Sequence, residues 1–148
     1  MSFKSWFNRI DNNVAYGVAN SCNLIAAQLR DIKYDGLLGF SQGGIMIRHY
    51  LRIASIIDSE AFKEVPLPRF VITVASPVFE RTEINYKEAN YQFEGSRHLD
   101  VPSLHLCGLQ DQLFPYLSHD KLFTLASNPR KLIYDDGHKF PRSLTTEN

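Results

Sequence analysis

An α/β fold with a mostly parallel sheet is predicted from two features of the sequence. Short apolar segments bounded by glycine or proline alternate with longer segments whose apolar residues recur at three- and four-residue steps, which is the pattern of strands that alternate with helices. The segment Gly39-Phe40-Ser41-Gln42-Gly43 joins one such strand directly to a helix. The chain has 148 residues, of which 44% are hydrophobic, so residues 1–148 are expected to form a single domain with one packed core.

Three helices are expected. The first covers residues 14–29, because apolar or small side chains recur there at helical spacing and residues 11–13 offer an N-cap. Its apolar or small positions are Val14, Val18, Cys22, Ile25 and Leu29. The second helix runs from Gln42 to about Ile57 and is apolar around most of its circumference, which predicts that it is well buried. Ser118 caps a third helix that extends to about Ser127.

Four strands are expected, at residues 36–40, 70–75, 103–107 and 131–134. Each is short and apolar, and prolines at positions 66, 68 and 102 precede two of them. Residues 79–99 are polar and aromatic without a clear period, so we expect an excursion that carries Tyr86, Tyr91 and Phe93 over the sheet. No internal repeat, low-complexity tract or linker divides the chain.

Charge and cysteine content exclude several classes of function. Sixteen basic and sixteen acidic side chains cancel without a block of one sign, so no surface for nucleic acid or anionic lipid is expected. Cys22 and Cys107 are far apart and lack metal-ligand spacing, which argues against a disulfide framework and a structural zinc site. No segment approaches the ~18 apolar residues of a membrane helix, and the first residues lack the apolar core of a signal peptide, so a cytoplasmic protein is expected.

Ser41 is the candidate nucleophile. It lies at the centre of a GxSxG match between a buried strand and a helix, a setting in which a sharp turn exposes the hydroxyl above the end of the sheet. Side chains at positions 39 and 43 are expected to crowd that turn. The simpler alternative is a plain turn in which Ser41 caps the helix, but a cap does not require glycine two residues away on both sides.

A nucleophilic serine needs a base and an acid, which follow it in the chain order Ser, then Asp or Glu, then His. Asp111 follows the strand that ends at Cys107, and His138 follows the strand that ends near Tyr134. Asp111 could instead only initiate a turn, and Asp135 or Asp136 could serve as the acid, although both share a loop with His138. Asp111 and His138 are therefore the predicted partners of Ser41.

The other histidines are weaker candidates for the base. His49 lies inside the helix after the serine, His105 lies inside a strand, His98 ends the irregular excursion, and His119 begins a helix. His138 could also be a surface histidine that follows a glycine. Cys107, at a strand end in the same region, is interpreted as a small core residue and not as a nucleophile.

Four blocks in this order resemble the FSH serine hydrolases, a family with the α/β-hydrolase fold. The blocks are YDGLLGFSQGG, PLPRFVITVAS, VPSLHLCGLQDQLFP and DGHKFP. Acyl-protein thioesterases share GFSQGG, but the GHKFP ending and the PLPRF block are more similar to the FSH group. The resemblance runs from about Trp6 to about Pro141 and implies Ser41 as nucleophile, Asp111 as acid and His138 as base.

The resemblance also implies parts that this sequence does not contain. Relatives have, before the position of Trp6, a first strand and a loop that contributes to the oxyanion hole, and after Pro141 they have a final helix. The backbone N–H of Gln42 supplies one oxyanion donor, and loss of a second typically costs about 2.7 to 4 kcal/mol of transition-state stabilisation. Residues 36–40 are then expected to form an open apolar sheet edge, which invites pairing with another copy in a homo-oligomer or with another chain. Two alternatives stay open: the sequence is an incomplete version of a longer protein, or it is a shortened relative that has lost catalysis.

The function expected from these features is hydrolysis of carboxylic esters through an acyl-enzyme, with a small-molecule or lipid-like substrate. Neither a metal ion nor an organic cofactor is required for that chemistry. Residues 79–99 are expected to set acyl-chain preference. The rival hypothesis is a catalytically silent binding module, inactive because the oxyanion loop is missing, that uses the open edge to bind a partner.

Overall fold

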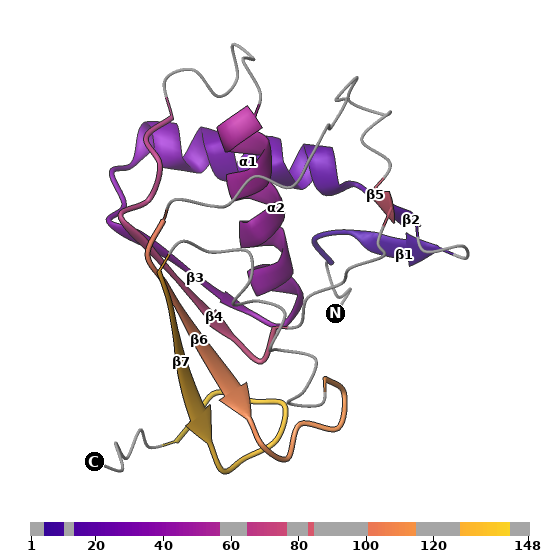
Figure 1. The fold of residues 1–148 in the computed structure, drawn as a ribbon. Coiled ribbons are helices and arrows are strands. Elements are labelled where there is room, and N and C mark those ends of the chain that lie inside the picture. The colour runs from indigo at the N-terminus through magenta and orange to yellow at the C-terminus, as the bar shows by residue number, and fades with distance from the viewer. Residues whose placement is uncertain are drawn as a thin grey trace.

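A four-stranded parallel sheet carries the candidate site. The computed structural model describes residues 5–10, 14–56, 65–76, 83–84, 101–114 and 128–142. Strands β3 (Gly36–Phe40), β4 (Phe70–Val74), β6 (Ser103–Gly108) and β7 (Pro129–Tyr134) follow one another in the order β3-β4-β6-β7. All neighbouring pairs are parallel, and Figure 1 shows their arrows fanning out toward one end. The predicted α/β fold class is confirmed.

Helices α1 (Val18–Asp31) and α2 (Gln42–Ile56) pack on one face of this sheet (Figure 1). Their apolar side chains form a single buried cluster with Leu37 and Val71, which point from β3 and β4 to the same side. The opposite face carries a second cluster, which includes Phe40, Val74 and Leu106. Because side chains alternate along each strand, the sheet contributes apolar side chains to two cores, one on each of its faces.

The second predicted helix is confirmed, and it is well buried as expected. Six apolar residues along α2 are 6% exposed or less; they are Ile45, Met46, Ile47, Tyr50, Leu51 and Ile53. The predicted third helix, from Ser118, lies outside the described residues. So does most of the 79–99 excursion, of which the structure describes only the strand β5 (Glu83–Ile84).

The start of the first predicted helix was wrong. Residues 14–16 form strand β2 (Val14–Tyr16), which pairs antiparallel with β1 (Asn8–Ile10) and parallel with β5. Gly17 then adopts a left-handed φ of 86° and becomes the N-cap of α1, in place of residues 11–13. The short strand shares its apolar spacing with the helix, so only the glycine marks the point where the two elements separate.

Strand β3 forms one edge of the four-stranded sheet, as predicted. Arg69 N–H donates to Asp35 O, and Ser41 N–H donates to Val74 O. Because backbone groups alternate in direction along a strand, those of Gly36, Leu38 and Phe40 point away from β4. The Leu38 side chain is 58% exposed.

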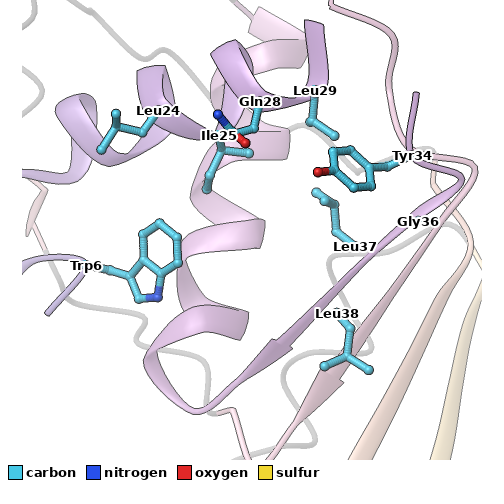
Figure 2. Close-up of a pocket in the computed structure, with 9 residues that line it drawn as sticks. All are labelled: Trp6, Leu24, Ile25, Gln28, Leu29, Tyr34, Gly36, Leu37 and Leu38. Atoms are coloured by element: carbon cyan, nitrogen blue, oxygen red, sulfur yellow. The ribbon is translucent and has the colours of Figure 1, made fainter. Parts of the chain in front are cut away.

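A groove of about 440 Å³ runs between this edge and α1 (Figure 2). Its lining is mostly apolar and includes Trp6, Leu24, Ile25, Leu29, Leu37 and Leu38. In the described part of the chain no strand pairs with the outer side of β3. An edge of this kind, beside exposed apolar side chains, is prone to pairing with another chain.

The open edge predicts self-association of the chain. Leu38→Lys places a charge on the edge strand, so we expect it to weaken association by about tenfold, equivalent to about 1.4 kcal/mol. Light scattering after size-exclusion chromatography, over a range of protein concentrations, measures the effect. Leu67→Lys is the matched control, because Leu67 is similarly exposed, at 50%, but lies outside β3. A wild type that stays monomeric at every concentration would contradict the prediction, as would equal effects of both variants.

Candidate functional site

Ser41 occupies a strained turn between β3 and α2. Its φ is 51°, a left-handed value that is uncommon for a residue with a side chain. The backbone is held on both sides: Ser41 N–H donates to Val74 O at 2.9 Å, and Ser41 O accepts from Gly44 N–H at 3.1 Å. We call this strained turn between β3 and α2, residues 40–42, the elbow.

The glycines around Ser41 differ in their roles. A Cβ at Gly39 would lie 2.5 Å from Gly44 N, so the strand and the helix approach too closely for a side chain there. At Gly43 the prediction of crowding was wrong, because an added Cβ would meet nothing closer than Trp6 Nε1 at 3.7 Å. The second crowded position is Gly44, where a Cβ would lie 2.5 Å from Ser76 Oγ.

Asp111 is held in one orientation by the loop that follows β6. Its Oδ1 accepts hydrogen bonds from Leu113 N–H and Phe114 N–H, both at 2.9 Å. The carboxylate is fully buried, and its second oxygen, Oδ2, lies 2.8 Å from His138 Nδ1. Two backbone donors compensate for part of the cost of burying the charge.

His138 lies in the loop after β7, and two hydrogen bonds help to fix that loop. Tyr134 OH donates to Lys139 O at 2.6 Å, which closes the loop on itself. Gln110 N–H donates to Asp136 O at 3.0 Å, which ties the loop to the one that carries Asp111. Burial, together with the nearby carboxylate of Asp111, raises the pKa of Tyr134 to about 12, so its phenol stays protonated and remains a donor.

The three predicted site residues come together in space. Ser41 Oγ lies 2.9 Å from His138 Nε2, and His138 Nδ1 lies 2.8 Å from Asp111 Oδ2. An ionised carboxylate can only accept, so Nδ1–H donates to Asp111 and Nε2 is left to accept the Ser41 hydroxyl proton. The arrangement has the parts needed to take a proton from a hydroxyl.

Two aromatic rings flank the imidazole of His138. The centroids of Phe40 and Phe114 lie 5.0 and 5.2 Å from that of His138. Phe140 stacks on Phe40 at 5.1 Å. Sequence reasoning did not assign these rings to the site, although Phe40 adjoins Ser41 and Phe140 belongs to the DGHKFP block.

Two of the alternative bases, His49 and His105, lie in other surroundings. His49 lies in α2, where burial and the charges of Arg48 and Arg52 lower its pKa to about 3. Both ring nitrogens of the buried His105 face hydroxyls, Thr73 Oγ1 at 2.7 Å and Ser103 Oγ at 3.1 Å. His98 and His119 lie outside the described residues.

The two neighbouring carboxylates contact other groups in place of the imidazole. Asp135 accepts from Gln110 Nε2 at 2.8 Å. Asp136 pairs with Lys139 Nζ at 2.7 Å and accepts from Gly137 N–H at 2.8 Å. The hydrogen bonds from Lys139 and Gly137 lower the pKa of Asp136.

Both cysteines are free and buried, as expected for core residues. Burial raises the pKa of the Cys22 thiol to about 12, which keeps it protonated and unreactive. In the described part of the chain, no group of three or more histidine, cysteine or acidic residues could hold a metal ion. Within that same part, no helix is both long and apolar enough to cross a bilayer.

The strained φ of Ser41 predicts an unusual effect of glycine on stability. Ser41→Gly and Ser41→Ala both remove the hydroxyl, but only alanine keeps a Cβ in the left-handed conformation. We therefore expect Ser41→Gly to be more stable than Ser41→Ala by about 1 kcal/mol in urea unfolding. Ala27 in α1 provides the control, because Ala27→Gly in a right-handed helix should lose about 1 kcal/mol. Equal stability of the two Ser41 variants would argue against strain at the elbow.

Comparison of the sequence with curated proteins finds esterases. The chain is 31% identical over 129 residues to the human protein Esterase OVCA2, and 27% identical over 136 residues to the mouse protein of that name. The matches cover 86% and 91% of this chain but only 52% and 55% of those proteins. The chain thus spans about half the length of these relatives.

Solved structures resemble the fold. Maize acyl-protein thioesterase 2 superposes with a TM-score of 0.61 at 17% identity, over 93% of this chain and 66% of that one. A type II thioesterase, BorB, gives a TM-score of 0.57 at 14% identity, over 82% of this chain and 62% of that one. At these identities the likeness concerns the α/β-hydrolase fold. The family model described as Serine hydrolase (FSH1) matches residues 1–148, and the chain therefore belongs to the FSH1 serine hydrolase family.

Proposed function

We propose that this protein cleaves carboxylic esters through a covalent acyl-enzyme on Ser41. The observation that carries the proposal is the continuous chain of hydrogen bonds from Ser41 Oγ to His138 Nε2, at 2.9 Å, and from His138 Nδ1 to Asp111 Oδ2, at 2.8 Å. Membership of a serine hydrolase family and similarity to proteins named esterases support an ester as the substrate.

In the first half-reaction, Ser41 Oγ attacks the ester carbonyl carbon while His138 Nε2 takes the hydroxyl proton. Asp111 stabilises the imidazolium that forms and keeps Nδ1 protonated throughout. The backbone N–H of Gln42, the first residue of α2, donates to the developing oxyanion. The tetrahedral intermediate then collapses, the imidazolium protonates the alkoxide, and the alcohol leaves.

In the second half-reaction, His138 removes a proton from a water molecule, which attacks the acyl carbon bound to Ser41. Collapse of this second intermediate releases the carboxylic acid, and the imidazolium returns its proton to Ser41 Oγ. Every proton moves through His138, so neither a metal ion nor an organic cofactor takes part in these steps.

The surroundings of the site favour an uncharged, apolar substrate, either a small molecule or lipid-like. Leu109, Leu113 and Phe140 are 54%, 66% and 48% exposed, and they belong to the two loops that carry Asp111 and His138. Apolar side chains exposed beside a reactive group can bind an acyl or alkyl chain. The chain as a whole has no net charge to attract a polyanion.

We also propose that the protein works in a reducing compartment such as the cytoplasm. Cys22 and Cys107 are both free thiols at 0% exposure, which supports this location.

The test is hydrolysis of p-nitrophenyl esters of short and medium acyl length by the purified protein. Ser41→Ala and His138→Ala should reduce turnover to background. Asp111→Asn keeps an oxygen for Leu113 N–H and Phe114 N–H but offers an amide to Nδ1, so it should stabilise the wrong tautomer and lower kcat by about 10⁴-fold.

Asp135→Asn is the matched control for Asp111→Asn. Asp135 lies in the loop of His138 but bonds Gln110, so its substitution should leave kcat within about twofold of wild type. Turnover that is equally low in wild type and in Ser41→Ala would contradict the proposal and favour a catalytically silent interaction module.

A further inference from the structure

The side chain of Gln42 bridges the elbow to a segment far away in sequence. Trp6 N–H donates to Gln42 Oε1 at 2.9 Å, and Gln42 Nε2 donates to Phe7 O at 2.8 Å. The side-chain amide thus uses its acceptor on one residue of the segment and a donor on the next. We call this pair of hydrogen bonds the Gln42 clamp.

The segment that the clamp holds is anchored on its other side. Ser21 Oγ, in the first turn of α1, donates to Trp6 O. Phe7 is 9% exposed, belongs to the core beneath α1 and α2, and meets His49 edge-on with ring centroids 6.5 Å apart. Because the segment is fixed to both helices, it can serve as a rigid reference for the side chain of Gln42.

The backbone of Gln42 is positioned with its side chain. Gln42 is the first residue of α2, and the first N–H groups of a helix have no acceptor within the helix. Such a group is free to bind an oxyanion, but its direction depends on the φ and ψ of the residues that begin the helix. Because both the oxygen and the nitrogen of its amide are hydrogen-bonded, the side chain of Gln42 restrains the φ and ψ angles of this residue, which directly follows the strained Ser41.

We propose that Gln42 is a positioning residue, whose side-chain clamp to Trp6 and Phe7 orients its own backbone N–H toward the oxyanion. This inference rests on the proposed ester hydrolysis and assigns the Gln42 side chain a role in it. Only glutamine offers both a donor and an acceptor at this length: glutamate loses the donor to Phe7 O, and methionine loses both bonds while keeping the shape.

Trp6 provides a readout that does not require catalysis. It is the only tryptophan in the chain, its side chain is 44% exposed, and it forms one end of the groove beside β3 (Figure 2). Its indole Nε1 would lie 3.7 Å from a Cβ placed on Gly43, so the ring sits beside the elbow. Intrinsic fluorescence therefore reports whether the segment stays docked there.

The experiment compares Gln42→Met and Gln42→Glu with wild type in the full chain. Release of the clamp should increase the quenching of Trp6 fluorescence by acrylamide by about twofold and lower kcat for p-nitrophenyl esters by about 10- to 100-fold, because misplacement of a catalytic donor by about 1 Å costs that much. KM and the pH profile of kcat should stay unchanged, since the clamp touches neither His138 nor Asp111. Asn23→Met is the control, because Asn23 is an exposed amide on α1 that does not line the groove beside Trp6.

The possible outcomes distinguish failure of the clamp proposal from failure of the proposed ester hydrolysis. Unchanged quenching and unchanged kcat in Gln42→Met would overturn the proposal, and so would increased quenching with wild-type kcat, which would make the clamp structural only. If Gln42→Met does not fold, Gln42→Glu, which keeps the bond from Trp6 N–H, decides by the same criteria. A wild type without ester turnover contradicts the proposed function and with it the oxyanion role, whereas unchanged quenching in an active enzyme contradicts the clamp alone.

Discussion

The parallel pairing of β6 with β7 determines where the carboxylate and the imidazole meet. The register joins Gly108 to Tyr134, the last residue of each strand. Parallel strands end at the same edge of a sheet, so the two loops begin side by side and Leu109 N–H can donate to Tyr134 O. Asp111 is the third residue after Gly108, and His138 is the fourth residue after Tyr134. The 2.8 Å contact between them is a consequence of backbone hydrogen bonding.

Ser41 directly follows β3 and therefore lies at the same C-terminal end of the sheet, where its backbone is strained. A left-handed φ on a residue with a side chain costs roughly 1–3 kcal/mol, and Ala75, at the end of the neighbouring β4, has a similar φ of 48°. Hydrogen bonds from Ser41 N–H to Val74 O and from Ala75 N–H to Leu106 O hold both residues in place. The sheet thus supports the strained turn that exposes the hydroxyl, and Gln42 connects this turn to the segment around Trp6 and Phe7.

Much of this arrangement was predictable, because the signals are local. The strand, the glycines and the helix around Ser41 are contiguous, and the positions of Asp111 and His138 just after apolar strands indicate the edge to which they belong. Of the three carboxylates weighed as the acid, Asp111 contacts His138, whereas Asp135 and Asp136 bond Gln110 and Lys139.

The features that were missed depend on contacts between distant residues. Three-residue strands such as β1 and β2 have no period of their own, so the apolar Val14 was read as part of a helix. The crowding at Gly44 comes from Ser76, two residues beyond the end of β4, and no spacing rule identifies it. The Gln42 clamp joins residues 35 and 36 positions apart, and only the folded chain brings them together.

A fluorophosphonate probe measures whether His138 activates Ser41, as we propose. The probe reacts with a serine only when its hydroxyl is activated, and intact-mass and peptide mass spectrometry locate and time the adduct. We expect stoichiometric labelling on Ser41 in wild type and labelling at least about 10³-fold slower in folded His138→Ala. Absence of labelling in folded wild-type protein, or equal rates in the two proteins, would contradict the proposal.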